Sequence, residues 1–176
     1  MRPSSRFALV LVPLLAMLGH ASAARAQAPK PDATLRDALL KHWTDVGGKI
    51  VKMAEEFPEN KYEFRPTPEV RTFADNLRHV AFWNTFVSKT IKGEKVDPKQ
   101  NELPKAEYPS KAAIVKALKS SLDEATELLK KSADTPSAKV ADLWVSFIEH
   151  SGEHYGQLVV YYRLNGIVPP ASRGGN

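Results

Sequence analysis

Residues 147–158 read FIEHSGEHYGQL, and this stretch shows how the chain is built. Apolar residues on both sides of it, such as Trp144 and Leu158, follow the spacing of three and four residues that is typical of an amphipathic helix. Residues four apart on a helix lie on one face. His150 and His154 can therefore direct their ring nitrogens at one shared point, on the face that the apolar residues turn inward.

An inward imidazole needs a partner. Burying a polar ring without a hydrogen bond or a metal ion costs about 1–3 kcal/mol. Gly152 and Gly156 each weaken a helix by about 1 kcal/mol relative to alanine, so we expect close helix packing or room for a ligand beside them. The stretch predicts a helix with a functional inner face.

Four segments of the chain carry apolar residues at helical spacing. They cover residues 35–57, 72–93, 110–129 and 140–165. No stretch alternates as a strand does, and there is no internal repeat. The sequence therefore predicts an all-α protein, a four-helix bundle in a single domain at residues 27–176.

The predicted helices have start and stop signals. Thr34 and Thr72, each followed three residues later by an aspartate, favour helix N-termini, as does Ser110. Residues 135–136, Thr-Pro, suit an N-cap and first position for the fourth helix, and Gly166 suits its C-terminal cap. Residues 58–71 and 94–109, polar and containing prolines, are expected to be connections.

A third histidine, His79, lies within the apolar arc of the second predicted helix. Taken alone, an inward histidine is a hydrogen-bonded core residue more often than a ligand. The presence of His150 and His154 favours a ligand role for His79, because three imidazoles are enough for an open metal site.

Residues 1–26 have the pattern of a cleaved secretory signal peptide. Arg2 and Arg6 precede an apolar stretch at residues 7–18, and small residues suit cleavage between positions 23 and 28. An uncleaved anchor is the alternative, but the apolar run is shorter than the ~20 residues that span a bilayer. We therefore predict a secreted or periplasmic protein without a stable membrane anchor.

The charge of the chain gives no sign of nucleic-acid binding. The net charge of +5 falls to +2 without the signal, because residues 1–26 hold three of the 25 basic residues and none of the 20 acidic ones. No basic face with interleaved aromatic residues is found. The absence of cysteine excludes disulfides and thiolate ligands, so a transition-metal site must use histidines and carboxylates.

The sequence resembles the DinB-like superfamily. The resemblance is carried by residues 77–81 (LRHVA) and residues 149–170 (EHSGEHYGQLVVYYRLNGIVPP), and by residues 57–66 (FPENKYEFRP) before the second helix. It implies a four-helix bundle of up-up-down-down type, a homodimer, and a divalent metal held near one end by three histidines. Residue by residue, these ligands correspond to His79, His150 and His154.

The resemblance also suggests chemistry. Some relatives transfer low-molecular-weight thiols to electrophiles or isomerise thiol adducts, but those enzymes and their thiols are cytoplasmic, which a secretory signal does not match. Three neutral imidazoles suit Zn, Ni or Fe, and an open coordination position would support a metal-dependent hydrolase or transferase acting on a small-molecule substrate. Glu153 and Tyr155 are candidate catalytic proton-transfer groups.

Three other interpretations stay open. The bundle can be a non-catalytic binding protein that a metal stabilises, or its histidines can be satisfied by hydrogen bonds without metal. The string His-x-x-Glu-His at residues 150–154 also matches inverted zinc proteases. However, such an enzyme takes a further carboxylate ligand downstream, and no Asp or Glu follows His154.

Overall fold

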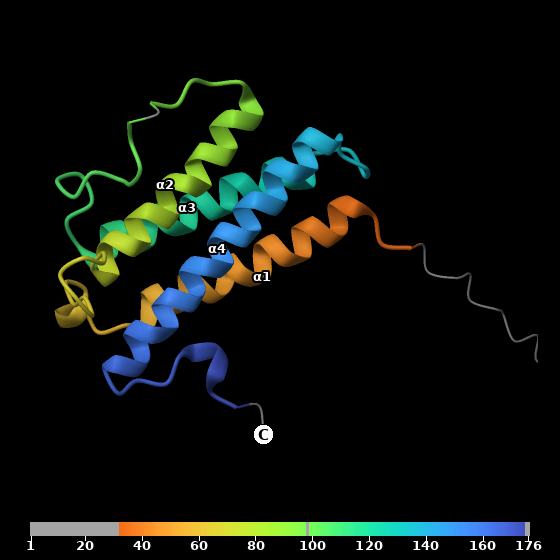
Figure 1. The fold of residues 1–176 in the computed structure, drawn as a ribbon. Coiled ribbons are helices and arrows are strands. Elements are labelled where there is room, and N and C mark those ends of the chain that lie inside the picture. Colours follow the sequence, from red (N-terminus) through yellow and green to blue (C-terminus); the bar gives the residue numbers. More distant parts are fainter. Residues whose placement is uncertain (1–31, 98, 175–176) are drawn as a thin grey trace, which may run out of the picture. The chain divides into compact units, whose positions relative to one another are not determined.

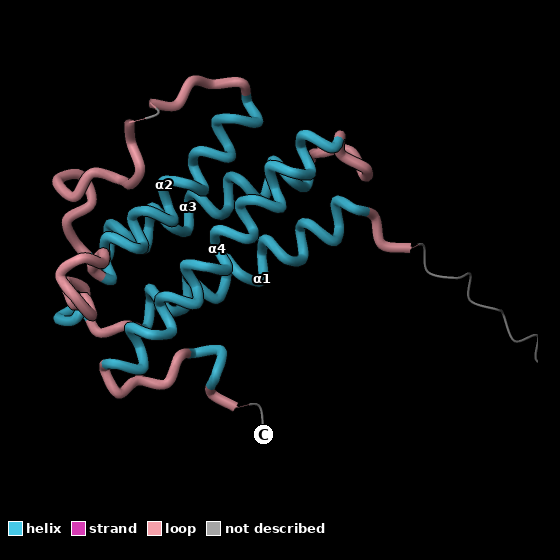
Figure 2. The backbone as a smooth tube through the Cα atoms, in the orientation of Figure 1, coloured by secondary structure: helices cyan, strands magenta, loops and turns pink. Residues whose placement is uncertain are grey.

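A computed structural model describes residues 32–97 and 99–174, so the predicted signal peptide at residues 1–26 lies outside the described residues. The described part contains four helices and no strand (Figures 1 and 2), which confirms the all-α four-helix bundle. The helices are α1 (Leu35–Glu56), α2 (Phe73–Lys92), α3 (Lys111–Lys130) and α4 (Ala138–Leu164), with short 3-10 turns η1 (Glu59–Lys61) and η2 (Pro170–Ser172). Within residues 32–97 and 99–174, no helix combines the length and the apolar character needed to cross a membrane.

The helices run up, down, down and up in chain order (Figure 1). At the start of α2, Arg78 Nε donates to the carbonyl of Tyr108 just before α3, and near the other end of this pair Lys92 bridges to Glu124. Helices α2 and α3 are therefore parallel. The same holds for α1 and α4, whose C-terminal ends are joined by a hydrogen bond from the Tyr162 hydroxyl to the Met53 carbonyl.

This order corrects the up-up-down-down type that the family resemblance implied. The reason is the way the two proline-containing connections fold. In the first, the amides of Phe73 and Ala74 donate to the carbonyls of Phe64 and Tyr62, so α2 begins beside the end of α1 and runs back. The second, described at residues 94–97 and 99–110, returns along the length of α2 before α3 begins (Figure 2).

Two clusters of buried side chains fill the bundle. Near the start of α1 and α4, Trp43 and Trp144 pack edge to face with ring centroids 5.2 Å apart. Toward the opposite end, Phe57 and Phe73 stack at 3.9 Å within a second aromatic cluster. The cores at the two ends hold the helices in fixed register, and this register sets which residues of α2 and α4 face each other.

Most predicted helix ends are confirmed. The side chains of Thr34, Thr72 and Ser110 accept hydrogen bonds from backbone amides three residues on, and Gly166 adopts a positive φ of 70° directly after the cap of α4. The predicted cap at residues 135–136 is wrong by two residues. The N-cap of α4 is Ser137, because its hydroxyl is the one that accepts from the Val140 amide.

Candidate metal centre

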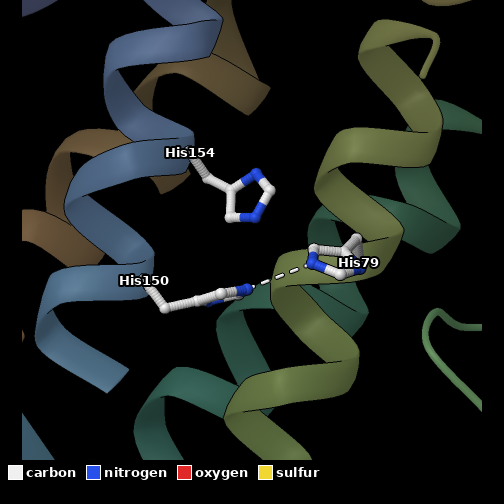
Figure 3. Close-up of side chains that lie close together, drawn as sticks. All are labelled: His79, His150 and His154. Atoms are coloured by element: carbon white, nitrogen blue, oxygen red, sulfur yellow. Dashed lines mark hydrogen bonds between the residues drawn. The ribbon is translucent and has the colours of Figure 1, made fainter. Parts of the chain in front are cut away.

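Three histidines from two helices meet at one point of the bundle (Figure 3). One nitrogen from each of His79, His150 and His154 lies within 4.8 Å of the other two. The Nε2 atoms of His79 and His150 are 3.1 Å apart. His79 and His154 are buried and His150 is half-buried, so the cluster lies at the edge of the core with one side toward the surface.

The antiparallel crossing of α2 and α4 brings these residues together. His150 and His154 are one turn apart on α4 and their ring centroids are 4.4 Å apart, as the spacing of four residues predicts. His79 comes from the facing surface of α2, and its ring centroid is 5.1 Å from that of His150 and 4.6 Å from that of His154.

The connection between α2 and α3 orients His79. The Nδ1 atom of His79 lies 2.6 Å from the backbone carbonyl oxygen of Asn101. A carbonyl only accepts, so Nδ1 carries the proton and Nε2 presents a lone pair to the cluster. The side chain of Asn101 accepts a hydrogen bond of 3.2 Å from Trp83 Nε1, which anchors the connection at this point.

A buried amide from α2 orients His154 in the same way. The Nδ1 atom of His154 lies 2.7 Å from Oδ1 of Asn76. The Nδ2 atom of Asn76 donates to Oε1 of Gln157 at 3.1 Å, so the Asn76 oxygen is the end that faces the imidazole. The proton of His154 is therefore on Nδ1, and its Nε2 lone pair also faces the cluster.

These contacts fit the donor set that a transition metal requires. Nitrogen ligands lie about 2.0–2.1 Å from zinc, so two imidazoles on one ion have their nitrogens roughly 3 Å apart. The separation of 3.1 Å between His79 and His150 agrees with this value. The carbonyl of Asn101 and the amide of Asn76 serve as the outer hydrogen-bond partners that metal-bound histidines normally have.

The surroundings of the cluster favour neutral imidazoles. Burial, with the positive charge of Arg71 and the neighbouring His150, lowers the pKa of His79 to about 4. Burial, with the neighbouring His150 and His79, lowers the pKa of His154 to about 3. Burial and then Arg71 also lower the pKa of His150. At neutral pH all three rings are therefore uncharged, which is the form that binds a metal.

The structure does not place the two predicted catalytic residues with the histidines. Glu153 is exposed on α4. Tyr155 packs against the core on the side of α1, where the Lys49 amine lies 5.9 Å from the centre of its ring. A methyl group added at Gly152 or Gly156 would meet no atom within 4 Å, so close helix packing does not explain these glycines.

Sequence reasoning missed three residues around the cluster. Asn76 precedes His79 by one helical turn, and this spacing was a usable signal, because residues three apart share a helix face. Asn101 acts through its backbone and Arg71 through its charge, from segments without periodicity. Only the packing of these connections against α2 shows their roles.

A comparison with known protein families shows which family this chain belongs to. Residues 33–158 match the DinB superfamily, and this range includes His79, His150 and His154. The chain belongs to the DinB superfamily. No curated protein matches its sequence. Proteins of the DinB type bind metals, and the three-histidine cluster of this DinB protein is compatible with that property.

Proposed function

We propose that this DinB-superfamily protein binds one divalent transition metal ion, Zn, Ni or Fe, through His79, His150 and His154. The observation that carries the proposal is the convergence of the three imidazoles, two of which have lone pairs turned inward by Asn101 and Asn76. Hydrogen bonds within the cluster do not satisfy all three Nε2 atoms. One proton can be shared between His79 and His150, but no donor in the cluster is then left for Nε2 of His154.

We further propose that the site is that of a metal-dependent hydrolase or transferase. A bound divalent ion supplies Lewis acidity and lowers the pKa of water toward ~7. Three protein ligands leave positions open, whereas purely structural zinc sites have four. The three histidines would hold the ion, and His79 and His154 keep their protons on the outer nitrogens. His150 is half-buried, so the open positions would lie on the side of the cluster nearest the surface.

A non-catalytic role for the metal is the second candidate. The three ligands join α2 to α4, so an ion bound there would tie two helices that have opposite directions. Metal binding of this kind contributes directly to folding free energy. The two roles differ in the open coordination position, which only a catalytic site needs.

The proposed location is outside the cytoplasm. It is supported by the pattern of residues 1–26. Substrates that depend on cytoplasmic thiols fit this location poorly, so a small molecule of another kind is proposed. The homodimer implied by the family resemblance stays a prediction.

The test is the metal content of the mature protein, purified without a histidine tag and measured by elemental mass spectrometry. We expect about one divalent ion per chain, lost in both His79→Ala and His150→Ala. The matched control is His42→Ala, because His42 is exposed on α1. Absence of metal after reconstitution with Zn, Ni and Fe, or retention of metal in both variants, would refute the proposal.

Catalysis is tested separately on metal-loaded protein. An exchangeable water at the ion, detected by water-proton relaxation after loading with Mn or Co, is expected for an enzyme. An ion without exchangeable water would favour the structural role.

A further inference from the structure

A pocket of about 730 Å³ lies between the segment that precedes α2 and the last turns of α4, and its lining residue Gln157 is three residues beyond His154 on α4. Its walls are mainly apolar and include Val70 and Val160. Four polar side chains also line it, those of Glu69, Arg71, Gln157 and Tyr161. An apolar pocket with a few polar groups is the usual form of a small-molecule site.

Gln157 connects this pocket to the histidine cluster. It lines the pocket and accepts a hydrogen bond from Asn76, whose oxygen in turn holds His154. One side chain therefore separates the pocket wall from a proposed metal ligand. One turn further along α4, the Tyr161 hydroxyl donates to the Arg71 carbonyl at 2.5 Å, which fixes the backbone that carries the guanidinium.

Arg71 is the positive charge of the pocket. Its Nε donates to Oε2 of Glu102 at 3.2 Å, and Glu102 directly follows Asn101, the residue that holds His79. The side chains of Arg71 and Glu102 are 37% and 44% exposed. A bridge this exposed is weak because water screens it, so an arriving anion can exchange with Glu102. The carboxylate that lines the pocket, that of Glu69, is hydrogen-bonded within its own turn to Thr67.

The backbone at the start of α2 offers no alternative anion site. The amides of Phe73 and Ala74 donate to carbonyls of residues 64 and 62, and the amide of Asp75 donates to the Thr72 hydroxyl. Recognition of a negative group in this pocket therefore depends on the guanidinium, which suits carboxylates because it can donate two parallel hydrogen bonds.

We propose that the ligand of this pocket is a small organic anion, a carboxylate on an apolar body, that Arg71 binds by exchanging its partner Glu102. Val70 and Val160 pack against the apolar body, and the remaining end of the ligand lies toward the three histidines. This inference rests on the proposed function, since it names the substrate class of the same metal site. Arg71 is then the residue that selects charged over neutral substrates.

The test uses two probes of the same shape, 4-methylpentanoate and its neutral amide, titrated calorimetrically into the full mature protein with and without metal. We expect the carboxylate to bind about tenfold more tightly than the amide, in keeping with one charge-assisted hydrogen-bonded pair. In Arg71→Gln this preference is lost. The matched control is Arg65→Gln, which removes the same charge from an exposed position on the same segment. This variant should keep the preference for the carboxylate.

Glu102→Gln provides an independent readout. Removal of the counterion frees Arg71, so the carboxylate is expected to bind more tightly than in the wild-type protein. Equal binding of the two probes to the wild-type protein, absence of binding by both, or a preference unchanged in Arg71→Gln would overturn the inference. A preference for the carboxylate that survives in Arg71→Gln but disappears with a chelator would come from the metal. That result would also overturn the inference.

Failure of this inference and failure of the proposed function can be told apart. If metal is bound with the expected stoichiometry and the probes show no preference through Arg71, the anion site fails alone. If no metal is bound but the metal-free protein keeps an Arg71-dependent preference, the metal proposal fails and the anion site stands.

Discussion

The Nε2 atom of His79 on α2 lies 3.1 Å from the Nε2 atom of His150 on α4, although the two residues are 71 positions apart in the chain. Because His79 donates from Nδ1 to the Asn101 carbonyl, the proton between the two Nε2 atoms belongs to His150 in the metal-free protein. A metal ion bound at this Nε2 atom would require the His150 proton to lie on Nδ1 instead, and it would link the two helices more strongly than the shared proton does.

Metal removal is therefore expected to lower the thermal stability of the bundle. An ion present at about 100 times its dissociation constant stabilises the folded state by roughly 2.7 kcal/mol, which corresponds to about 5–10 °C in the melting temperature of a domain of this size. The measurement is thermal unfolding followed by circular dichroism, with and without a chelator. In His150→Ala the chelator should have no effect, and an equal effect in both proteins would contradict the prediction.

Replacement of Asn76 by alanine is expected to weaken metal binding about 10- to 100-fold, because His154 loses the group that fixes its proton on Nδ1. The matched control is Asn84→Ala. Asn84 is also buried on α2 but donates to Ser121, away from the histidines. Both variants should lose about 1–3 kcal/mol of unfolding free energy. Only Asn76→Ala should change the affinity measured by competition with a metal indicator, and equal affinities would refute the role of Asn76.

The helices were predictable because their signals are local. Thr34, Thr72 and Ser110 cap helices through contacts that reach only three residues along the chain. The cap of α4 was misplaced because Thr135 and Ser137 are both capable caps within one short segment, and the local sequence does not separate them. Only the three-dimensional path of the chain selects Ser137.

The directions of the helices and the surroundings of the site were harder to predict from the sequence. Whether a connection reverses the chain or runs along the bundle depends on long-range hydrogen bonds, such as that from the Ala74 amide to the Tyr62 carbonyl. The pairing of His150 with His154 was predictable from helical period. The contribution of Asn101 was not, since it depends on how residues 99–110 pack against α2.

The metal-free protein is expected to lose stability on mild acidification. The pKa of His79 is about 4 and that of His154 about 3 in the folded state, against an ordinary value of 6.5. Between pH 6.5 and these values the unfolded chain binds more protons, so the stability present above pH 6.5 declines as the pH falls. The slope approaches roughly 1 kcal/mol per pH unit for each of the two histidines.

Urea unfolding in the presence of a chelator, at several pH values from 7 to 5, measures this slope above the range in which carboxylates titrate. His79→Gln removes one of the titrating groups and should make the slope shallower by up to roughly 1 kcal/mol per pH unit. A wild-type stability that is constant over this range would show that the imidazoles are not held neutral by the fold.

The two neighbouring glycines in α1 are expected to respond differently to the same substitution. A methyl group at Gly47 would overlap the side chain of Leu122 on α3, whereas one at Gly48 would meet no atom within 4 Å. Alanine is favoured over glycine by about 1 kcal/mol in a helix, so Gly48→Ala should stabilise the protein by about that amount. Gly47→Ala gains the same preference but must displace Leu122, at a cost of about 1–3 kcal/mol. Urea unfolding should therefore rank Gly48→Ala above Gly47→Ala by about 1–3 kcal/mol, and equal stabilities would show that α1 and α3 do not approach closely at Gly47.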